Sequence, residues 1–203
     1  MWYGQTRDAG GKLQSFSRFL DVIAHELTHG VTETTSNLVY KNQSGALNES
    51  FSDIFGIIIK NWFQVGADSD VSKWSWELGP GLGEDGRPLR DLSDPKRTGD
   101  PDHMDSYLVT NRDSGGVHTN SNIHNKAAFN VLTARGANGP IFTAREVSLL
   151  YYVTLTRLSS LASFKDTLNE LLAVAAVYYA GNPSDAATRG RAIEDAYAAV
   201  GIK

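Results

Sequence analysis

The chain contains no cysteine among its 203 residues. Disulfide bonds and thiolate metal sites are therefore excluded, and any metal ion must be held by histidine, aspartate or glutamate. Long hydrophobic runs are also missing, because no window reaches the roughly 18 uninterrupted apolar residues that cross a bilayer. We expect no membrane partner, and no signal-peptide pattern follows Met1.

Neither positive nor negative charge dominates the chain. The chain has 19 lysines and arginines against 23 aspartates and glutamates, for a net charge of −4. Nucleic-acid binding calls for a basic surface, so no nucleic-acid partner is expected. Apolar residues make up 41% of the chain, which suffices for a hydrophobic core at this length. The composition predicts a folded domain rather than a disordered one.

The apolar pattern is mainly helical, because apolar residues recur at spacings of three and four. The predicted helices span residues 16–34, 45–63, 120–134, 144–159, 164–179 and 183–200. Residues 66–116 are instead rich in Gly, Pro and Asp, which indicates a long loop region with a function of its own. The first residues fit at most a short strand or hairpin. The predicted fold class is mainly α.

The sharpest motif is His25-Glu26-Leu27-Thr28-His29. On a helix, residues four apart share a face, so both imidazoles can point at one ion. Glu26 then lies beside the ion, where it can take a proton from a metal-bound water. Catalytic zinc uses three protein ligands and one open position. The alternative is a solvated helix face that binds no metal.

A second predicted helix offers a third ligand. Glu49 and Asp53 are four residues apart and share a face. Glu49 can ligate the ion, while Asp53 can accept the second N–H of a ligating histidine and so fix its tautomer. The alternative is again a solvated acidic face. The surrounding residues are apolar, however, and two carboxylates that point the same way there need partners.

These motifs, at residues 21–33 and 45–56, resemble the thermolysin family of zinc peptidases, closest to its calcium-poor, protealysin-like branch. Stretches at 89–95, 99–103, 115–121 and 196–201 continue the resemblance in the family's order. The resemblance implies that residues 19–203 form a thermolysin-like C-terminal helical domain that binds zinc. Residues 1–18, which begin Met1-Trp2-Tyr3-Gly4, then correspond to the end strand and linker of the family's N-terminal domain.

The resemblance also implies roles for single residues. His25, His29 and Glu49 correspond to the zinc ligands, and Glu26 corresponds to the general base. Asp53 matches the carboxylate that orients the first ligating histidine.

Four further positions match residues that act on the substrate. Tyr40 and His118 resemble the pair that stabilises the oxyanion, and Asp113 resembles the carboxylate that orients this histidine. Arg90 resembles the arginine that hydrogen-bonds a substrate carbonyl. On the sequence alone, packing for Tyr40 and a surface charge for Arg90 are the commoner roles. His124, like His103, receives no functional role.

The implied activity is zinc-dependent endopeptidase action on peptides or proteins. Val22, Leu78 and Leu89 match apolar pocket positions of the family, so cleavage on the N-terminal side of bulky apolar residues is expected. Secretion from a bacterial cell follows from the same resemblance. The family's N-terminal domain or a pro-segment is the expected partner.

Two other classes of function remain open. The first is a zinc-binding C-terminal fragment with little or no activity without the N-terminal domain. Such a fragment exposes an apolar surface and can self-associate through it. The second is a metal-dependent hydrolase that acts on something other than peptides.

The chain departs from the family's pattern at the residues that correspond to its double calcium site. Asp21 and Glu77 match two of its acidic positions, but Lys60, Ser75 and Pro80 stand where three acidic residues are expected. A lysine among the ligands repels a divalent cation, so we expect the double calcium site to be absent.

Overall fold

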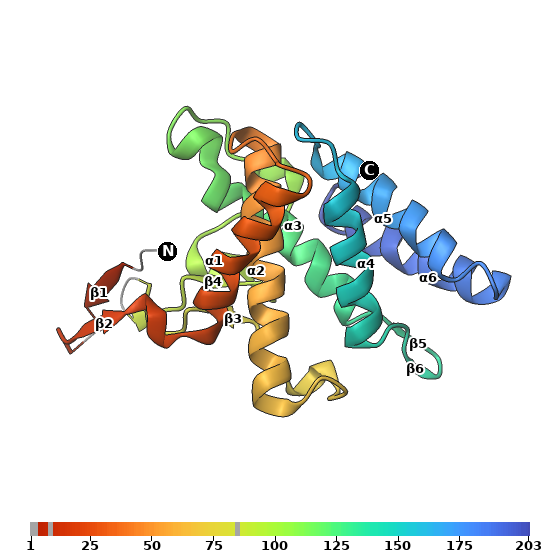
Figure 1. The fold of residues 1–203 in the computed structure, drawn as a ribbon, viewed down its shortest axis with the longest axis horizontal. Coiled ribbons are helices and arrows are strands. Elements are labelled where there is room, and N and C mark those ends of the chain that lie inside the picture. The colour runs from red at the N-terminus through yellow and green to blue at the C-terminus, as the bar shows by residue number, and fades with distance from the viewer. Residues whose placement is uncertain (1–3, 8–9, 84–85) are drawn as a thin grey trace.

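The computed structural model describes residues 4–7, 10–83 and 86–203. Residues 1–3, which begin the segment matched to the family's N-terminal domain, lie outside this part of the chain. Over the described ranges, six α-helices and three two-stranded antiparallel hairpins make up the regular structure, together with short 3-10 turns (Figure 1). The predicted mainly α fold class is confirmed. None of the described helices is both long enough and apolar enough to cross a membrane.

All six predicted helices are present, most with ends shifted by a few residues, but the third begins at Asp113 rather than at residue 120 and so starts inside the predicted loop region. They are α1 (Leu20–Thr34), α2 (Asn42–Val65), α3 (Asp113–Leu132), α4 (Ala144–Arg157), α5 (Phe164–Tyr178) and α6 (Pro183–Ala198). The hairpins pair β1 (Gln5–Arg7) with β2 (Leu13–Ser15), β3 (Glu77–Leu78) with β4 (Arg90–Asp91), and β5 (Arg135–Gly136) with β6 (Gly139–Pro140). Neither the β3–β4 hairpin nor the β5–β6 hairpin was predicted from the sequence.

The short N-terminal hairpin agrees with the sequence prediction. It projects from the helical body, and a 3-10 turn, η1 (Phe16–Arg18), leads from it into α1 (Figure 1). The described part of the long loop region holds the β3–β4 hairpin and the 3-10 turns η2 (Val71–Lys73), η4 (Pro95–Thr98) and η5 (Met104–Ser106). The β3–β4 hairpin pairs Leu78 with Arg90, and β3 packs against α2.

The antiparallel helices α1 and α2 lie side by side (Figure 1). Gly56 permits their close approach, because a Cβ atom there would lie 2.7 Å from the carbonyl oxygen of Asp21. The other side of α2 packs against α3. Buried residues therefore occur all around α2, and they include the acidic side chains Glu49 and Asp53.

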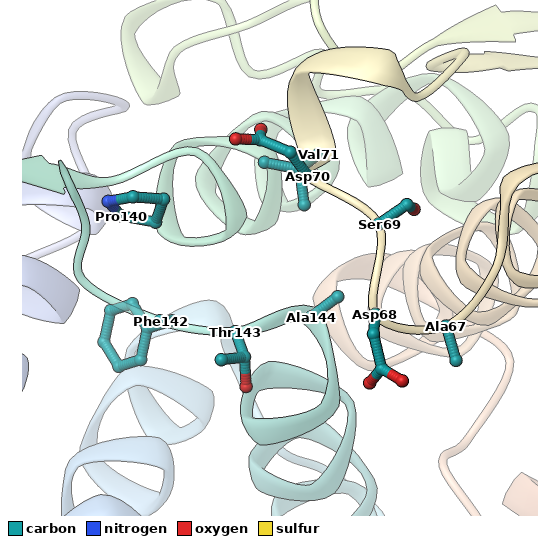
Figure 2. A pocket seen from close by; sticks show the side chains of 9 residues that line it. All are labelled: Ala67, Asp68, Ser69, Asp70, Val71, Pro140, Phe142, Thr143 and Ala144. Carbon is teal, nitrogen blue, oxygen red and sulfur yellow. The ribbon is translucent and has the colours of Figure 1, made fainter.

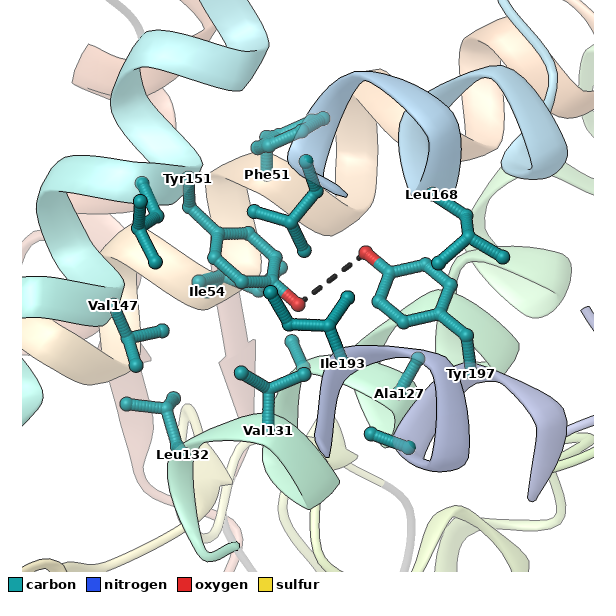
Figure 3. Close-up of a cluster of buried hydrophobic side chains, with 14 of the residues drawn as sticks. Phe51, Ile54, Ala127, Val131, Leu132, Val147, Tyr151, Leu168, Ile193 and Tyr197 are labelled. Atoms are coloured by element: carbon teal, nitrogen blue, oxygen red, sulfur yellow. Dashed lines mark hydrogen bonds between the residues drawn. The ribbon is translucent and has the colours of Figure 1, made fainter. Parts of the chain in front are cut away.

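The main hydrophobic core lies between α2 and the later helices (Figure 3). Phe51 and Ile54 of α2 belong to it, together with Tyr151 of α4 and with Ile193 and Tyr197 of α6, and each is at most 1% exposed. Full burial of one large apolar side chain contributes about 1.5–3 kcal/mol. This packing fixes α2 from the side opposite α1. It therefore also fixes the polar residues that α2 turns toward α1.

Candidate metal centre

Three candidate ligands converge between α1 and α2. His25 and His29 lie one turn apart on α1, and their Nε2 atoms are 3.0 Å from each other. Glu49 of α2 places Oε2 at 3.5 Å from His25 Nε2 and Oε1 at 3.5 Å from His29 Nε2. One ligand atom from each of the three residues lies within 4.8 Å of the other two. The packing of two helices thus assembles the triad.

Hydrogen bonds fix the tautomers of both rings. His25 Nδ1 donates to Asp53 Oδ1 at 2.8 Å, and His29 Nδ1 donates to Asn48 Oδ1 at 2.6 Å. With Nδ1 of each ring in these hydrogen bonds, Nε2 is the nitrogen that each ring turns toward the other. Two imidazole nitrogens 3.0 Å apart beside a buried carboxylate form a group of donor atoms that suits a bound cation.

The donor set fits zinc. Glu49 is 1% exposed, and its Oε2 atom has no hydrogen-bond partner, which is costly for a buried carboxylate oxygen. Zinc–ligand bonds of about 2.0–2.2 Å place tetrahedral ligands about 3.3 Å apart. The two Nε2 atoms here are 3.0 Å apart, and each lies 3.5 Å from a different oxygen of Glu49. Two imidazoles and one carboxylate are also a ligand set of catalytic zinc sites.

Asn48 contacts His29, although the sequence pattern gave Asn48 no role in the site. Its side-chain oxygen holds His29 much as Asp53 holds His25, and its Nδ2 atom donates to the Leu38 carbonyl oxygen at 3.3 Å. The available signal was its place directly before Glu49. That signal is weak, because adjacent helical residues point in different directions.

Asp53 is fully buried and accepts from three residues. Its Oδ1 accepts from His25 Nδ1 and Arg90 Nη2, both at 2.8 Å, and its Oδ2 accepts from Asn125 Nδ2 at 2.8 Å. Burial alone raises the pKa of this carboxyl group, but the Arg90 guanidinium and the bond from His25 outweigh burial and lower the pKa. Asp53 is therefore an ionised acceptor whose contacts fix the orientation of His25.

Arg90 reaches the centre from the β3–β4 hairpin. Its Nε atom lies 2.6 Å from Asp53 Oδ2, and its Nη2 atom lies 3.7 Å from Glu49 Oε2. Burial lowers the pKa of this guanidinium, but the two carboxylates outweigh burial and raise the pKa. The side chain is only 12% exposed, which excludes the surface-charge alternative. Contact with a substrate carbonyl stays a prediction.

Tyr40 and His118 meet beside Glu49. The Tyr40 hydroxyl donates to Glu49 Oε1, and His118 Nε2 lies 3.2 Å from that hydroxyl and 3.4 Å from the same carboxylate oxygen. His118 Nδ1 donates to Asp113 Oδ1 at 2.6 Å. Burial and the bond to Glu49 raise the pKa of Tyr40, so its hydroxyl keeps its proton. The ring is 42% exposed and is not a core packing residue.

A left-handed turn at the start of α3 positions Asp113 and His118. Residues 113–116 all have positive φ, from 50° to 96°. The turn lets the backbone N–H of His118 donate to Asp113 Oδ2 at 2.9 Å. Gly115 also lies close to α2, where a Cβ atom would come within 2.2 Å of Asn42 Oδ1. Glycine is the residue that tolerates both the positive φ and the close approach.

Glu26 follows His25 on α1 and is partly exposed. One residue along a helix turns the side chain by about 100°, so Glu26 leaves α1 in a different direction from the two imidazoles. Its carboxylate does not belong to the converging ligand atoms. Glu26 therefore lies beside the centre without being part of the ligand set.

Comparison with known proteins agrees with this arrangement. The family model described as thermolysin metallopeptidase, alpha-helical domain, matches residues 36–202. The chain belongs to the thermolysin metallopeptidase family. A second model, described as thermolysin metallopeptidase, catalytic domain, matches residues 1–33. Thermolysin-family proteins use zinc, as the donor set indicates. A domain boundary between residues 18 and 19 stays a prediction.

Named relatives of the chain include an extracellular elastase and bacillolysins from bacteria. An extracellular elastase from Staphylococcus epidermidis is 46% identical over 146 residues, which cover 72% of this chain and 26% of the relative. Bacillolysin from Bacillus cereus is 36% identical over 200 residues, with coverage of 95% and 33%. The solved structure of the precursor of protealysin, a metalloproteinase from Serratia proteamaculans, matches with a TM-score of 0.79 and 30% identity. That match covers 97% of this chain and 65% of the other.

The chain thus spans only 26% of the elastase and 33% of the bacillolysin. The activity, substrates and partners of the whole thermolysin-family protein are treated as proposals below.

The residues matched to the thermolysin-family substrate pocket lie on two elements. Leu78 and Leu89 are adjacent in the β3–β4 segment, where Leu89 N donates to the Leu78 carbonyl oxygen at 2.9 Å. Leu89 is partly exposed, whereas Leu78 and Val22 of α1 are buried. Their role as a substrate pocket stays a prediction.

Two cavities differ in their relation to the metal centre. One, of about 540 Å³, borders His29, Asn48 and Tyr40, so a ligand there lies next to the centre. The other, of about 280 Å³, lies between residues 67–71 after α2 and residues 140–144 at the start of α4 (Figure 2). The second cavity is lined by none of the predicted site residues.

Lysine occupies the region matched to the family's double calcium site. Lys60 Nζ lies 3.1 Å from Asp21 Oδ2 and donates to the carbonyl oxygen of Glu77. The backbone N–H of Gly79 donates to the same Asp21 oxygen at 3.1 Å. The ammonium group therefore neutralises the Asp21 carboxylate, while the Glu77 carboxylate pairs with Arg97 Nη1 at 2.6 Å.

Proposed function

We propose that this chain supplies the zinc-holding, helical half of a secreted bacterial endopeptidase. The observation that carries the proposal is the meeting of Tyr40 and His118 at the carboxylate of Glu49, which also faces His25 and His29. A zinc site with a structural role alone has no need of two exposed polar donors beside a ligand. Peptide hydrolysis needs them at an oxyanion.

In this proposal His25, His29 and Glu49 would hold zinc, which would supply Lewis-acid polarisation of a peptide carbonyl and a lower pKa for a bound water. Glu26 takes the proton from the attacking water and later delivers it to the leaving amine. Its position directly after a ligand, but outside the ligand set, supports this role.

Tyr40 and His118 stabilise the negative charge that develops on the carbonyl oxygen. The Tyr40 hydroxyl keeps its proton and can turn from Glu49 toward the substrate. Asp113 fixes the ring of His118 through Nδ1, so Nε2 is the atom that faces the substrate. Preorganised donors of this kind contribute about 10²–10³ in kcat each.

Arg90 and the apolar residues Val22, Leu78 and Leu89 bind the substrate on the leaving-group side. Arg90 is already oriented by Asp53, which leaves it little side-chain entropy to lose on binding. The apolar residues favour bulky apolar side chains after the scissile bond. In the whole protein, the family's N-terminal domain, to which residues 1–18 belong, forms the other wall of the cleft.

A second candidate is a zinc-binding fragment with little activity of its own. It is favoured by the exposed apolar side chains along α1 and α2, where Leu27 is 56% exposed and Phe63 is 81% exposed. Such a surface suits the family's N-terminal domain or a second copy of the chain.

Cleavage of a quenched peptide with Leu after the scissile bond tests the proposal. The 203-residue chain is assayed with zinc, with a chelator, and with zinc restored. Chelator-sensitive cleavage that zinc restores supports peptidase action by this half. A folded, zinc-loaded chain that does not cleave, at any protein concentration, supports the fragment. A chain that binds no zinc contradicts both candidates.

A further inference from the structure

Buried hydrogen bonds lead from Asp53 away from the metal centre into the core. Asn125 Nδ2 donates to Asp53 Oδ2 at 2.8 Å, and Asn125 Oδ1 accepts from the Ser50 hydroxyl at 2.6 Å. Ser50 Oγ lies 2.7 Å from His124 Nδ1, and His124 Nε2 lies 2.8 Å from the Tyr197 hydroxyl. All five side chains have zero exposure. The proposed metal-centre roles use none of the residues beyond Asp53.

Only one arrangement of protons satisfies these bonds. The Ser50 hydroxyl gives its single proton to Asn125, so it must accept from His124 Nδ1. A neutral His124 with a proton on Nδ1 has an acceptor at Nε2, which receives the Tyr197 proton. The Tyr197 oxygen then accepts from Tyr151 across 3.3 Å (Figure 3). Every donor in the series points toward Asp53.

His124 is held as a neutral ring with a fixed orientation. Burial lowers its pKa to about 3, so the ring carries no charge at neutral pH. The plane of the His124 ring lies nearly parallel to the ring of Phe164, with the two ring centroids 6.0 Å apart. The centroid of the Phe51 ring lies 5.4 Å from the centroid of the His124 ring. Core packing therefore supports the orientation that the hydrogen bonds require.

We propose that His124 is a positioning residue of the metal centre, which acts through Ser50, Asn125 and Asp53 on His25. Donors aligned in one direction polarise one another, so the loss of one link weakens the bonds beyond it. The series fixes the side of Asp53 that faces away from α1. The His25 Nδ1 proton then has a single acceptor in a single place, which directs Nε2 at the metal.

The effect on zinc affinity rests on the proposed zinc site, whereas the effect on the His25 proton does not. A histidine that only fills space in the core affects stability and leaves both properties unchanged. The two explanations therefore differ in measurable ways.

Substitutions that remove a single hydroxyl group test the proposal most directly. Tyr197→Phe removes the donor to His124 and keeps the ring, while Ser50→Ala removes the link in the middle. Tyr179→Phe is the matched control, because Tyr179 is also buried, at 8% exposure, but lies outside the series. Zinc dissociation constants are measured by competition with a chelator.

We expect Ser50→Ala to weaken zinc binding about tenfold, the lower end of the range for partners of metal ligands. Tyr197→Phe should act in the same direction but less strongly, and Tyr179→Phe should match the parent. The double variant Ser50→Ala/Tyr197→Phe should bind no more weakly than Ser50→Ala alone, because a broken series no longer transmits the upstream change. Additive losses, or affinities equal to the parent, would overturn the proposal.

A second readout uses the metal-free chain. The exchange of the His25 Nδ1 proton with solvent, followed by NMR, should be faster in Ser50→Ala and Tyr197→Phe than in Tyr179→Phe. Equal exchange rates overturn the proposal even if the variants lose stability. A parent chain without zinc affinity refutes the proposed function, and the exchange rates still decide the role of His124. If Ser50→Ala does not fold, the comparison of the two tyrosine variants decides alone.

Discussion

Lys60 and Asp21 form a buried ion pair between α2 and α1, with Nζ 3.1 Å from Oδ2 and both side chains at most 6% exposed. The pair lies in the region that corresponds to the family's double calcium site, where Asp21 and Glu77 match acidic positions and Lys60 does not. The internal ammonium group joins α1, α2 and the β3 strand, because it also donates to the Glu77 carbonyl oxygen. The Lys60 side chain thus links α1, α2 and β3 at the position where the family binds calcium.

Removal of this cation should therefore be costly. We expect Lys60→Met to lower the free energy of unfolding by about 3–5 kcal/mol, because Asp21 is left buried and unpaired. Lys165→Met, at an exposed lysine of α5, should change stability by less than about 0.5 kcal/mol. Urea unfolding measures both. The parent should gain no stability from millimolar calcium, and a clear rise of its Tm with calcium would contradict the expectation that the double site is absent.

The role of Glu26 can be separated from metal binding. Glu26→Gln should lower kcat of any cleavage by about 10²–10⁴, the contribution of general acid–base catalysis, while zinc content stays at the level of the parent. Glu49→Ala is the contrasting variant and should lose zinc, since it removes a proposed ligand. Metal analysis of both purified variants checks this. Loss of zinc from Glu26→Gln would assign Glu26 to the ligands instead.

The turn that holds His118 depends on glycine. Gly115→Ala places a side chain at φ +96° and a Cβ atom 2.2 Å from Asn42 Oδ1. We expect a loss of about 1–3 kcal/mol in the free energy of unfolding, and a lower kcat because Asp113 and His118 shift. Gly190→Ala in α6 is the control, because nothing lies within 4 Å of its Cβ position. That substitution should stabilise the chain by up to about 1 kcal/mol.

His124 should make the chain sensitive to acid. Its pKa falls from 6.5 to about 3 on burial, so the unfolded chain binds a proton in this range that the folded chain does not. Stability is therefore unaffected above about pH 6.5 and falls as the pH drops toward about 3. The complete loss is on the order of 5 kcal/mol. Urea unfolding of metal-free parent and His124→Gln between pH 4 and 7 tests this, and equal slopes against pH would contradict it.

The helices and the approach of His25 to His29 were predictable because both depend on short-range spacing. His25 and His29 are four residues apart, so one helix suffices to bring them together, and Glu49 follows on the next helix. The accumulation of Gly, Pro and Asp in residues 66–116 likewise predicted the long loop region. The pairwise contacts inside that region were not predictable in the same way.

The contacts that depend on helix packing could not be read from the sequence. Arg90 lies 37 residues beyond Asp53, and its burial against that carboxylate depends on where the β3–β4 hairpin lies on α2. His124 looked like an ordinary helical residue, and its link to Ser50 exists only because α3 packs on α2. Neither relation has a fixed spacing in the chain.

The three converging ligands all come from α1 and α2, whose axes are brought close together at Gly56. The residues proposed to face the substrate, by contrast, lie outside regular helix interiors: Tyr40 precedes α2, Arg90 is on a two-residue strand, and His118 follows a left-handed turn. Under the proposed function, the residues that would hold the ion therefore lie on packed helices, and the residues that would face the substrate lie at or beside connecting segments. Replacements in those segments would then be expected to change substrate preference more readily than replacements within α1 and α2. The architecture is suited to divergence in specificity under a constant chemistry.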